Sequence, residues 1–292
     1  GGGILMNELV VISGKGGTGK TTITACFAAL AGGNAVLVDA DVDAPNLSLV
    51  TQPQQLENHE FRASKKAKID LEACSSCGLC LELCRFGAIS DDYYIDPVCC
   101  EGCGVCSRAC PENAIAMHEV VSGHWFISQT SYGKLVHARL GVAEENSGIL
   151  VTAIRKKAKI IAEEEQKHYL ITDGPPGIGC PVIASLGGAK EALIVTEPTL
   201  SGIHDLERVL SVCRHFKIPA SVCINRYDLY EENARAIEDY CRQESIELAA
   251  KIPFDRAFVE ATAQGVPVVE YTDGPIYNRI KRLWEKMAAV LN

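Results

Sequence analysis

Nine of the fourteen cysteines are concentrated in the segment 74–110, and eight of these nine form two runs with the same spacing. Each run reads C-x2-C-x2-C-x3-C, and a proline follows the second run. Because the chain lacks the basic and apolar start of a secretory signal, thiols clustered in this way are typical of metal binding rather than of disulfides. The runs are Cys74, Cys77, Cys80 and Cys84, and Cys100, Cys103, Cys106 and Cys110.

The two runs are copies of one unit. An offset of 26 residues maps every cysteine of the first run onto its counterpart in the second. The same offset maps Ile69-Asp70 onto Ile95-Asp96, Gly78 onto Gly104 and Ala88-Ile89 onto Ala114-Ile115. This internal duplication resembles the bacterial 2×(4Fe–4S) ferredoxins over about residues 66–118.

The resemblance implies two 4Fe–4S clusters, with the fourth cysteine of each run bound to the cluster of the other run. Zinc is the alternative, although zinc sites usually take pairs of C-x2-C around one ion rather than two interlocking quartets. Arg85 stands where the first run would have proline, and Cys99 is surplus. The expected ligand sets are Cys74, Cys77, Cys80 and Cys110 for one cluster, and Cys100, Cys103, Cys106 and Cys84 for the other.

The segment Gly14–Thr21 (GKGGTGKT) satisfies the phosphate-binding pattern G-x4-G-K-[ST]. It follows the apolar stretch Glu8–Ser13 and opens an amphipathic stretch from Lys20 to Ala31, which is the strand–loop–helix context that the pattern requires. Lys20 is expected on the β- and γ-phosphates, and the hydroxyl of Thr21 on Mg²⁺. The residues expected to bind the nucleotide are Gly14, Gly16, Gly17, Thr18, Gly19, Lys20, Thr21 and Thr22.

A second lysine in the loop, Lys15, makes the pattern similar to the deviant P-loop of the MinD, ParA and nitrogenase iron protein superfamily. The resemblance implies an ATPase that dimerises, with Lys15 reaching the nucleotide of the partner. It also implies a catalytic role for Asp41, where relatives orient the attacking water, although Asp39 and Asp43 remain alternatives. Asp173, in the segment DGPPG, resembles the switch II aspartate that holds Mg²⁺ through water.

The identity of the base depends on Asn225, which matches the adenine-contacting asparagine of this superfamily. The segment Asn225–Asp228 (NRYD) also approximates N-K-x-D, the guanine-reading pattern of GTPases. The deviant P-loop favours ATP over GTP.

Strand and helix patterns alternate before residue 50 and again from Asn146, so the fold class expected is α/β, with a doubly wound and mostly parallel sheet. Gln52–Glu57 is polar and turn-like, and the cysteine region interrupts the alternation after it. The domains expected are therefore residues 1–60 and 121–292 for the ATPase, and 61–120 for an inserted α+β ferredoxin-like domain. Strands are expected at Ala35–Asp39, Tyr169–Asp173, Ala192–Thr196, Ala220–Asn225 and Leu248–Ile252, and helices at Ser147–Gln166, Asp205–His215, Glu231–Gln243 and Pro275–Leu291.

The net charge of −9 argues against nucleic acid as a partner, and the apolar runs are too short to span a bilayer, so a cytoplasmic protein is expected. The apolar side of Pro275–Leu291 could lie on a membrane, but a terminal helix that closes the sheet is the preferred interpretation. Cys180, seven residues after Asp173, is interpreted as a small buried thiol; a ligand of a bridging cluster is the alternative. The remaining cysteines, Cys26, Cys213, Cys223 and Cys241, are expected in the core.

Together these motifs resemble MinD-superfamily ATPases with an inserted ferredoxin domain, and Glu144–Gly148 and Asp173–Gly188 strengthen the resemblance. The first hypothesis is an ATP-dependent redox protein, a homodimer or a heterodimer with a related ATPase, that serves a redox partner protein. The alternatives are an ATPase of iron–sulfur or metallocofactor assembly, and a positioning ATPase like MinD or ParA whose clusters are structural. Assembly ATPases carry a C-x-x-C in the ATPase body, which Cys213, Cys223 and Cys241 do not form.

Overall fold

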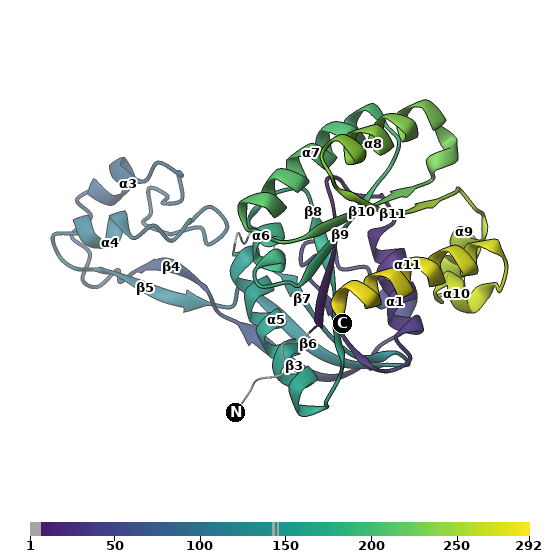
Figure 1. Ribbon diagram of the computed structural model, residues 1–292. Helices are drawn as coiled ribbons and strands as arrows, with labels where there is room; N and C mark the ends of the chain where they lie inside the picture. Colours follow the sequence, from purple (N-terminus) through teal and green to yellow (C-terminus); the bar gives the residue numbers. More distant parts are fainter. Residues whose placement is uncertain (1–6, 142–143, 145) are drawn as a thin grey trace. The chain divides into compact units, whose positions relative to one another are not determined.

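The structure is a computed structural model that describes residues 7–141, 144 and 146–292 (Figure 1). The chain divides into two compact units. The larger unit comprises Gly1–His59, Trp125–Arg139 and Ser147–Asn292, and the second unit, called here the cysteine unit, comprises Glu60–His124 and Leu140–Asn146. The cysteine unit is thus wider than the expected insertion 61–120 and includes a second, separate segment of the chain.

A nine-stranded sheet forms the centre of the larger unit, in the order β11-β10-β9-β1-β8-β2-β7-β6-β3. The pairs from β11 to β7 are parallel, so the expected mostly parallel α/β sheet is confirmed. The strands are β1 (Asn7–Ser13), β2 (Ala35–Asp39), β3 (Gln54–Phe61), β6 (Gly123–Thr130), β7 (Gly133–Leu140), β8 (Tyr169–Pro176), β9 (Glu191–Thr196), β10 (Ala220–Asn225) and β11 (Glu247–Ile252).

The alternation of side chains along β1 divides the core between the two faces of the sheet. Leu9 and Val11 belong to the apolar cluster beneath α1 (Lys20–Leu30) and α11 (Pro275–Leu291), whereas Val10 and Ile12 belong to the cluster beneath the helices of the other face (Figure 1). The sheet is therefore covered on both faces, as a doubly wound fold requires. The other helices of this unit are α2 (Ser48–Thr51), α5 (Ser147–Glu164), α6 (Cys180–Leu186), α7 (Leu200–His215), η1 (Tyr227–Leu229), α8 (Glu231–Gln243), α9 (Ala257–Ala263) and α10 (Val268–Tyr271).

The cysteine unit is built on one antiparallel pair, β4 (Ser64–Ile69) with β5 (Ile115–Val120), and two five-residue helices, α3 (Leu79–Leu83) and α4 (Val105–Ala109). The two helices follow the duplication, since each begins after a glycine with positive φ, Gly78 and Gly104. The apolar cluster of this unit is small, and two of its buried members are themselves cysteines, Cys80 and Cys100.

One sequence expectation is wrong in this part of the chain. Gln52–Glu57 was expected to be turn-like, but residues from Gln54 onward form the edge strand β3, whose first five side chains are exposed. The exposed side chains of this edge strand do not alternate between apolar and polar, so the strand could not be predicted from hydrophobic periodicity. The hairpin of β6 and β7, which joins β3 to the parallel sheet, was not anticipated either.

The terminal helix α11 closes one face of the sheet, as preferred. The apolar side considered for membrane binding, which includes Ile280, Leu283 and Trp284, is buried in the core beside Phe27 of α1. That side is therefore not available to a membrane surface. Over the described residues, every helix is too short or too polar to cross a bilayer.

Candidate nucleotide site and cysteine cavities

The loop 14–19 joins the carboxyl end of β1 to the start of α1 and places the helix N-terminus over an open cavity. Gly17 and Gly19 have φ values of +81° and +92°, which residues with a Cβ rarely adopt. A Cβ on Gly19 would also lie 2.5 Å from Nδ2 of Asn225. The loop conformation therefore depends on glycine at both positions, and the free N–H groups of the first helical turn face a site suited to an anion.

The cavity has a volume of about 640 Å³ and lies among the residues that the phosphate-binding pattern singles out. Gly16, Gly17, Gly19 and Lys20–Thr22 line it, together with Asp41. Thr18, in the same loop, has a buried hydroxyl oxygen without a hydrogen-bond partner within the described chain. Buried polar atoms are normally satisfied, so this hydroxyl fits a site that a ligand completes.

Lys20 lies in a ring of carboxylates. Its Nζ is 3.3 Å from Oδ2 of Asp41, and both side chains are about nine-tenths buried. Burial acts to lower the pKa of Lys20, but the charges of Asp173 and Asp41 outweigh it and raise the pKa overall. The ammonium group therefore stays protonated and can exchange a carboxylate for a phosphate when an anion enters.

Asp173 is fully buried within β8, where it pairs with Val11 of β1. Its carboxylate accepts hydrogen bonds from the hydroxyl of Thr21 at 2.6 Å and from that of Thr24 at 3.3 Å. Burial is the main cause that raises the pKa of Asp173, and the nearby charge of Lys20 opposes the shift. Thr21 and Asp173 are thus brought together in the arrangement in which a hydroxyl and a carboxylate can hold Mg²⁺.

The three candidate acids after β2 have different surroundings. Asp39 accepts hydrogen bonds from the backbone N–H groups of Leu47 and Asp41, so it stabilises the loop that follows β2. Burial raises the pKa of Asp39 to about 8. Asp41 and Asp43 line the cavity, whereas Asp39 does not. Asp41 is the one of the two that is buried and contacts Lys20.

Lys15 is held away from the phosphate cavity. Its Nζ donates to Oγ1 of Thr199 at 2.9 Å and lies 3.8 Å from the carboxylate of Glu197. Arg226 also pairs with Glu197. Glu197 and Thr199 follow β9 and were not anticipated, because a polar loop after an apolar strand has no pattern of its own. The action of Lys15 on a partner's nucleotide stays a prediction.

Asn225 lies at the carboxyl end of β10 and supports the phosphate loop, since its Nδ2 donates to the carbonyl of Thr18 at 2.8 Å. It lines a smaller cavity next to the loop together with Phe254 and Phe258, which sequence reasoning missed. Asp228, the last residue of the NRYD segment, accepts the backbone N–H of Phe254 at 2.7 Å. One of the two oxygens of this carboxylate, Oδ1, is therefore bonded to the backbone.

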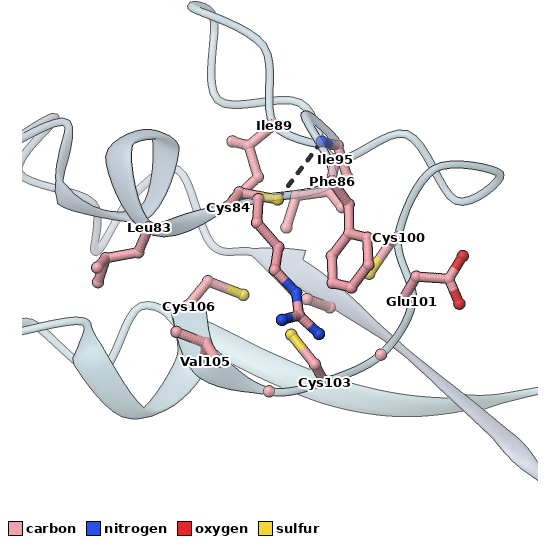
Figure 2. Close-up of a pocket in the computed structure, with 15 residues that line it drawn as sticks. Leu83, Cys84, Phe86, Ile89, Ile95, Cys100, Glu101, Cys103, Val105 and Cys106 are labelled. Atoms are coloured by element: carbon pink, nitrogen blue, oxygen red, sulfur yellow. Dashed lines mark hydrogen bonds between the residues drawn. The ribbon is translucent and has the colours of Figure 1, made fainter.

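In the cysteine unit the eight cysteines of the two runs divide between two cavities. The larger, of about 240 Å³, lies between α3 and α4 and is also lined by Leu83, Phe86 and Val105 (Figure 2). Its cysteines are Cys84 from the first run and Cys100, Cys103 and Cys106 from the second. The smaller, of about 20 Å³, is lined by Cys74, Cys77 and Cys80 from the first run and Cys110 from the second.

Backbone N–H groups point at sulfur in both cavities. Ala88 donates to Sγ of Cys84 and Ala114 to Sγ of Cys110, each at 3.4 Å, and these two contacts are related by the 26-residue offset. Hydrogen bonds to sulfur are one of the means by which proteins set the potential of iron–sulfur clusters. Within the described ranges, no three His, Cys, Asp or Glu side chains form a group that could hold one metal ion.

The cysteines outside the two quartets fall into two groups. Cys26, Cys213, Cys223 and Cys241 are buried, as expected for core thiols. Cys180 was interpreted as buried, and this is wrong, because it is exposed as the first residue of α6, where the chain emerges from Gly179. Cys99, the surplus thiol, is exposed and donates to Asp96.

With this geometry established, the relatives of the chain can be stated. The family described as CobQ/CobB/MinD/ParA nucleotide binding domain matches residues 9–268. The chain belongs to this family. An uncharacterised protein of Methanocaldococcus jannaschii is 31% identical over 287 residues, which cover 98% of this chain and 97% of that protein. The chain is also 25% identical to the iron–sulfur cluster carrier protein of Pyrococcus horikoshii over 298 residues, 96% of this chain and 85% of the carrier.

Among solved structures, the septum site-determining protein MinD of Pyrococcus horikoshii, complexed with Mg-ADP, has the same fold. The TM-score is 0.60 at 20% identity, with 98% of each chain covered. The family match over residues 9–268 makes the chain a P-loop protein of the MinD/ParA ATPase family, and the shared fold agrees with it.

Proposed function

We propose that this ATPase binds two 4Fe–4S clusters and couples ATP binding and hydrolysis, in a dimer, to electron transfer through them. The observation that carries the proposal is the division of the cysteines, three from one run and the fourth from the other, around each of two cavities. Two interlocking quartets are the ligand pattern of two-cluster ferredoxins. The smaller cavity would have to widen when a cluster bound.

The chemistry of the site favours clusters over zinc. A zinc ion takes all its sulfurs at about 2.3 Å from one point, whereas a cubane takes one thiolate on each of its irons, so its cysteines stand further apart. The division of the eight cysteines between two cavities fits the second arrangement. Bound clusters would supply one-electron redox chemistry. The chain itself supplies the thiolates, the N–H groups directed at sulfur and an apolar surrounding.

The nucleotide proposed is Mg-ATP. Thr21 and Asp173 would hold the metal ion, Lys20 the β- and γ-phosphates, and Asp41 the attacking water. ATP rather than GTP is supported by the deviant phosphate loop, in which Lys15 precedes Lys20, and by the Mg-ADP bound to the related MinD of Pyrococcus horikoshii. Lys15 would leave Thr199 and reach the nucleotide of the partner subunit when the dimer forms.

The first experiment is the metal content of protein purified without oxygen. We expect about eight irons and eight sulfides per chain, and the variants Cys84→Ser and Cys110→Ser should each lose the cluster whose other three ligands lie in the opposite run. Cys99→Ser, which removes a thiol outside both quartets, is the matched control and should keep the full load. About two zinc ions and no sulfide would contradict the proposal.

A second function has one observation in its favour, the 25% identity to a protein named as an iron–sulfur cluster carrier. A carrier would pass its cluster to an acceptor protein that lacks one, whereas an electron-transfer protein keeps its clusters through many reduction cycles. The two are separated by incubating the loaded protein with a cluster-free ferredoxin. Iron that stays with this chain while the clusters are reduced and reoxidised supports electron transfer.

A further inference from the structure

The loop that begins at Cys100 is docked on strand β4. The side chain of Lys66, in the middle of β4, donates to the carbonyl oxygen of Cys100 at 2.8 Å and is only 13% exposed. Two residues further, Gly102 has a φ of +65°, and a Cβ there would lie 2.0 Å from the carbonyl oxygen of Lys65. The first cysteine of the second run therefore takes its position from β4 and from Lys66 in particular.

Lys66 is itself held by the segment that ends the cysteine unit. Its Nζ lies 3.6 Å from Oε1 of Glu144, whose side chain is 10% exposed, and the other oxygen of Glu144 accepts the hydroxyl of Ser64. The same hydroxyl accepts Nδ2 of Asn146 at 2.8 Å. Glu144 and Asn146 thus fasten the start of β4, and neither residue lines the nucleotide cavity.

Directly after Asn146 the chain begins α5, which packs on α6. At Gly148 the fit is close, because a Cβ there would lie 3.3 Å from both Cβ and the carbonyl oxygen of Cys180, the first residue of α6. The helix α6 follows β8, whose Asp173 contacts Thr21 in the phosphate site. A displacement of α6 would therefore press on the start of α5, within two residues of Asn146.

We propose that Lys66, Glu144 and Asn146 are positioning residues that connect the nucleotide state to the cysteine ligand Cys100, with Gly148 as the point where α6 acts on the segment. The inference rests on the proposed function, since it needs a cluster at Cys100. Each step is a direct contact or a chain bond, from Asp173 along the chain to Cys180, then Gly148, Asn146 and Glu144, and finally Lys66 and Cys100. Packed elements joined in this way respond in discrete steps, so a small displacement at one end can be felt at the other.

The test uses anaerobically purified, cluster-loaded protein in the presence of Mg-ADP or a non-hydrolysable Mg-ATP analogue. Cluster potentials are measured by EPR titration, and hydrogen–deuterium exchange is measured in residues 64–69 and 100–104. In the parent protein we expect the two nucleotides to shift the reduction equilibrium by about tenfold, which is about 59 mV for one electron. The variants Lys66→Gln, Glu144→Gln and Gly148→Ala should reduce that shift to less than about threefold, with unchanged iron content and nucleotide affinity.

Matched controls separate positioning from general damage. Lys68→Gln removes an exposed lysine of the same strand, and Gly187→Ala adds a methyl group that meets nothing closer than 3.9 Å. Both should keep the full nucleotide-dependent shift, and Lys66→Arg, which retains the charge, should restore part of it. A full shift in Lys66→Gln, Glu144→Gln and Gly148→Ala alike would overturn the inference.

Failure of the proposed function gives a different result. If the parent protein holds clusters whose potentials are the same with both nucleotides, hydrogen–deuterium exchange tests whether the nucleotide state still reaches the cysteine unit. A nucleotide-dependent change in the exchange rates of residues 64–69 and 100–104 that disappears in Gly148→Ala supports the connection between the nucleotide site and Cys100. It does so without any coupling to reduction. No change in those residues in the parent protein overturns the connection as well.

Discussion

The nucleotide site and the cysteine unit organise their reactive groups in opposite ways. In the nucleotide site the charged groups are paired within the chain, Lys20 with Asp41 and Asp173 with Thr21, between α1 and the buried strands β2 and β8. In the cysteine unit, eight thiols surround two cavities, and the apolar cluster behind them is small and includes two of the cysteines. We therefore expect the nucleotide site to keep its arrangement when no ligand is bound, whereas the cysteine unit should depend on the proposed clusters for its stability.

The difference in size between the two units supports the same expectation about their stability. The apolar clusters of the larger unit cover both faces of a nine-stranded sheet. The cysteine unit has a two-stranded sheet and two helices of five residues each. Domains of fewer than about 70–80 residues rarely gain enough stability from an apolar core alone and usually need metals or disulfides.

The largest effect is expected when the clusters are removed with a chelator and an oxidant under conditions that keep the larger unit folded. Amide exchange within residues 64–120 should accelerate by about a thousandfold or more, while β1 and β8 keep their protection. The measurement is hydrogen–deuterium exchange before and after removal. Unchanged protection in the cysteine unit would break the comparison, because it would show that the unit folds without clusters.

The second effect concerns Lys15, which is paired with Thr199 and Glu197 rather than with the phosphate site. Lys15→Ala should lower ATP hydrolysis by about a hundredfold or more, because a cation opposite the transferring phosphoryl group is lost. Nucleotide affinity should stay within about threefold, since the side chain does not line the cavity. Phosphate release and light scattering measure hydrolysis and dimer formation, and a fully active monomeric variant would refute the role in the partner's site.

The next largest effect concerns the contribution of Lys20 to the affinity for ATP. Lys20→Ala should weaken ATP by about tenfold to a hundredfold, because a charge-assisted contact to the phosphates is removed. Isothermal titration with Mg-ATP measures it, and exchange protection of β1 checks that the site stays folded. Full ATP affinity in the variant would mean that the pairing with Asp41 is only structural.

The smallest effect separates the two cysteine cavities. Arg85 lines the larger cavity, with its guanidinium carbon 5.0 Å from the ring centre of Phe86, whereas Pro111 takes the equivalent place in the smaller one. Because reduction adds negative charge, Arg85→Pro should make reduction of the nearby cluster less favourable by about threefold, or roughly 30 mV. The shift is small because Arg85 is exposed and its charge is screened.

EPR titration of both clusters checks this prediction. Glu101→Gln, at the same cavity, should shift the potential in the opposite direction. Arg108→Ala removes a positive charge from α4 at a residue that lines neither cavity, and it should leave both potentials nearly unchanged. Two clusters that titrate together in the parent protein and in Arg85→Pro would show that the cavities are electrostatically equivalent.

The sequence was sufficient to predict those helices and strands that have a clear local pattern of apolar residues. The buried strands Ala35–Asp39 and Ala220–Asn225 and the helices Glu231–Gln243 and Pro275–Leu291 were predicted with the bounds that the structure has. Apolar periodicity specifies such elements, because each buries a continuous face. The edge strand β3 and the helices α9 and α10 carry weaker periodicity, and they were missed.

What the sequence determined by itself is the set of reactive groups, namely the phosphate loop and eight cysteines in a duplicated spacing, since both are patterns of residues close together in the chain. Tertiary structure decided which distant groups join them. Asp173 reaches Thr21 because β8 lies beside β1. Asp228 follows β10 and accepts a hydrogen bond from the backbone N–H of Phe254, which follows the neighbouring strand β11. The exposure of Cys180 and the contacts of Lys66 with Glu144 and Cys100 were equally beyond the sequence, because packing between segments far apart in the chain leaves no local pattern.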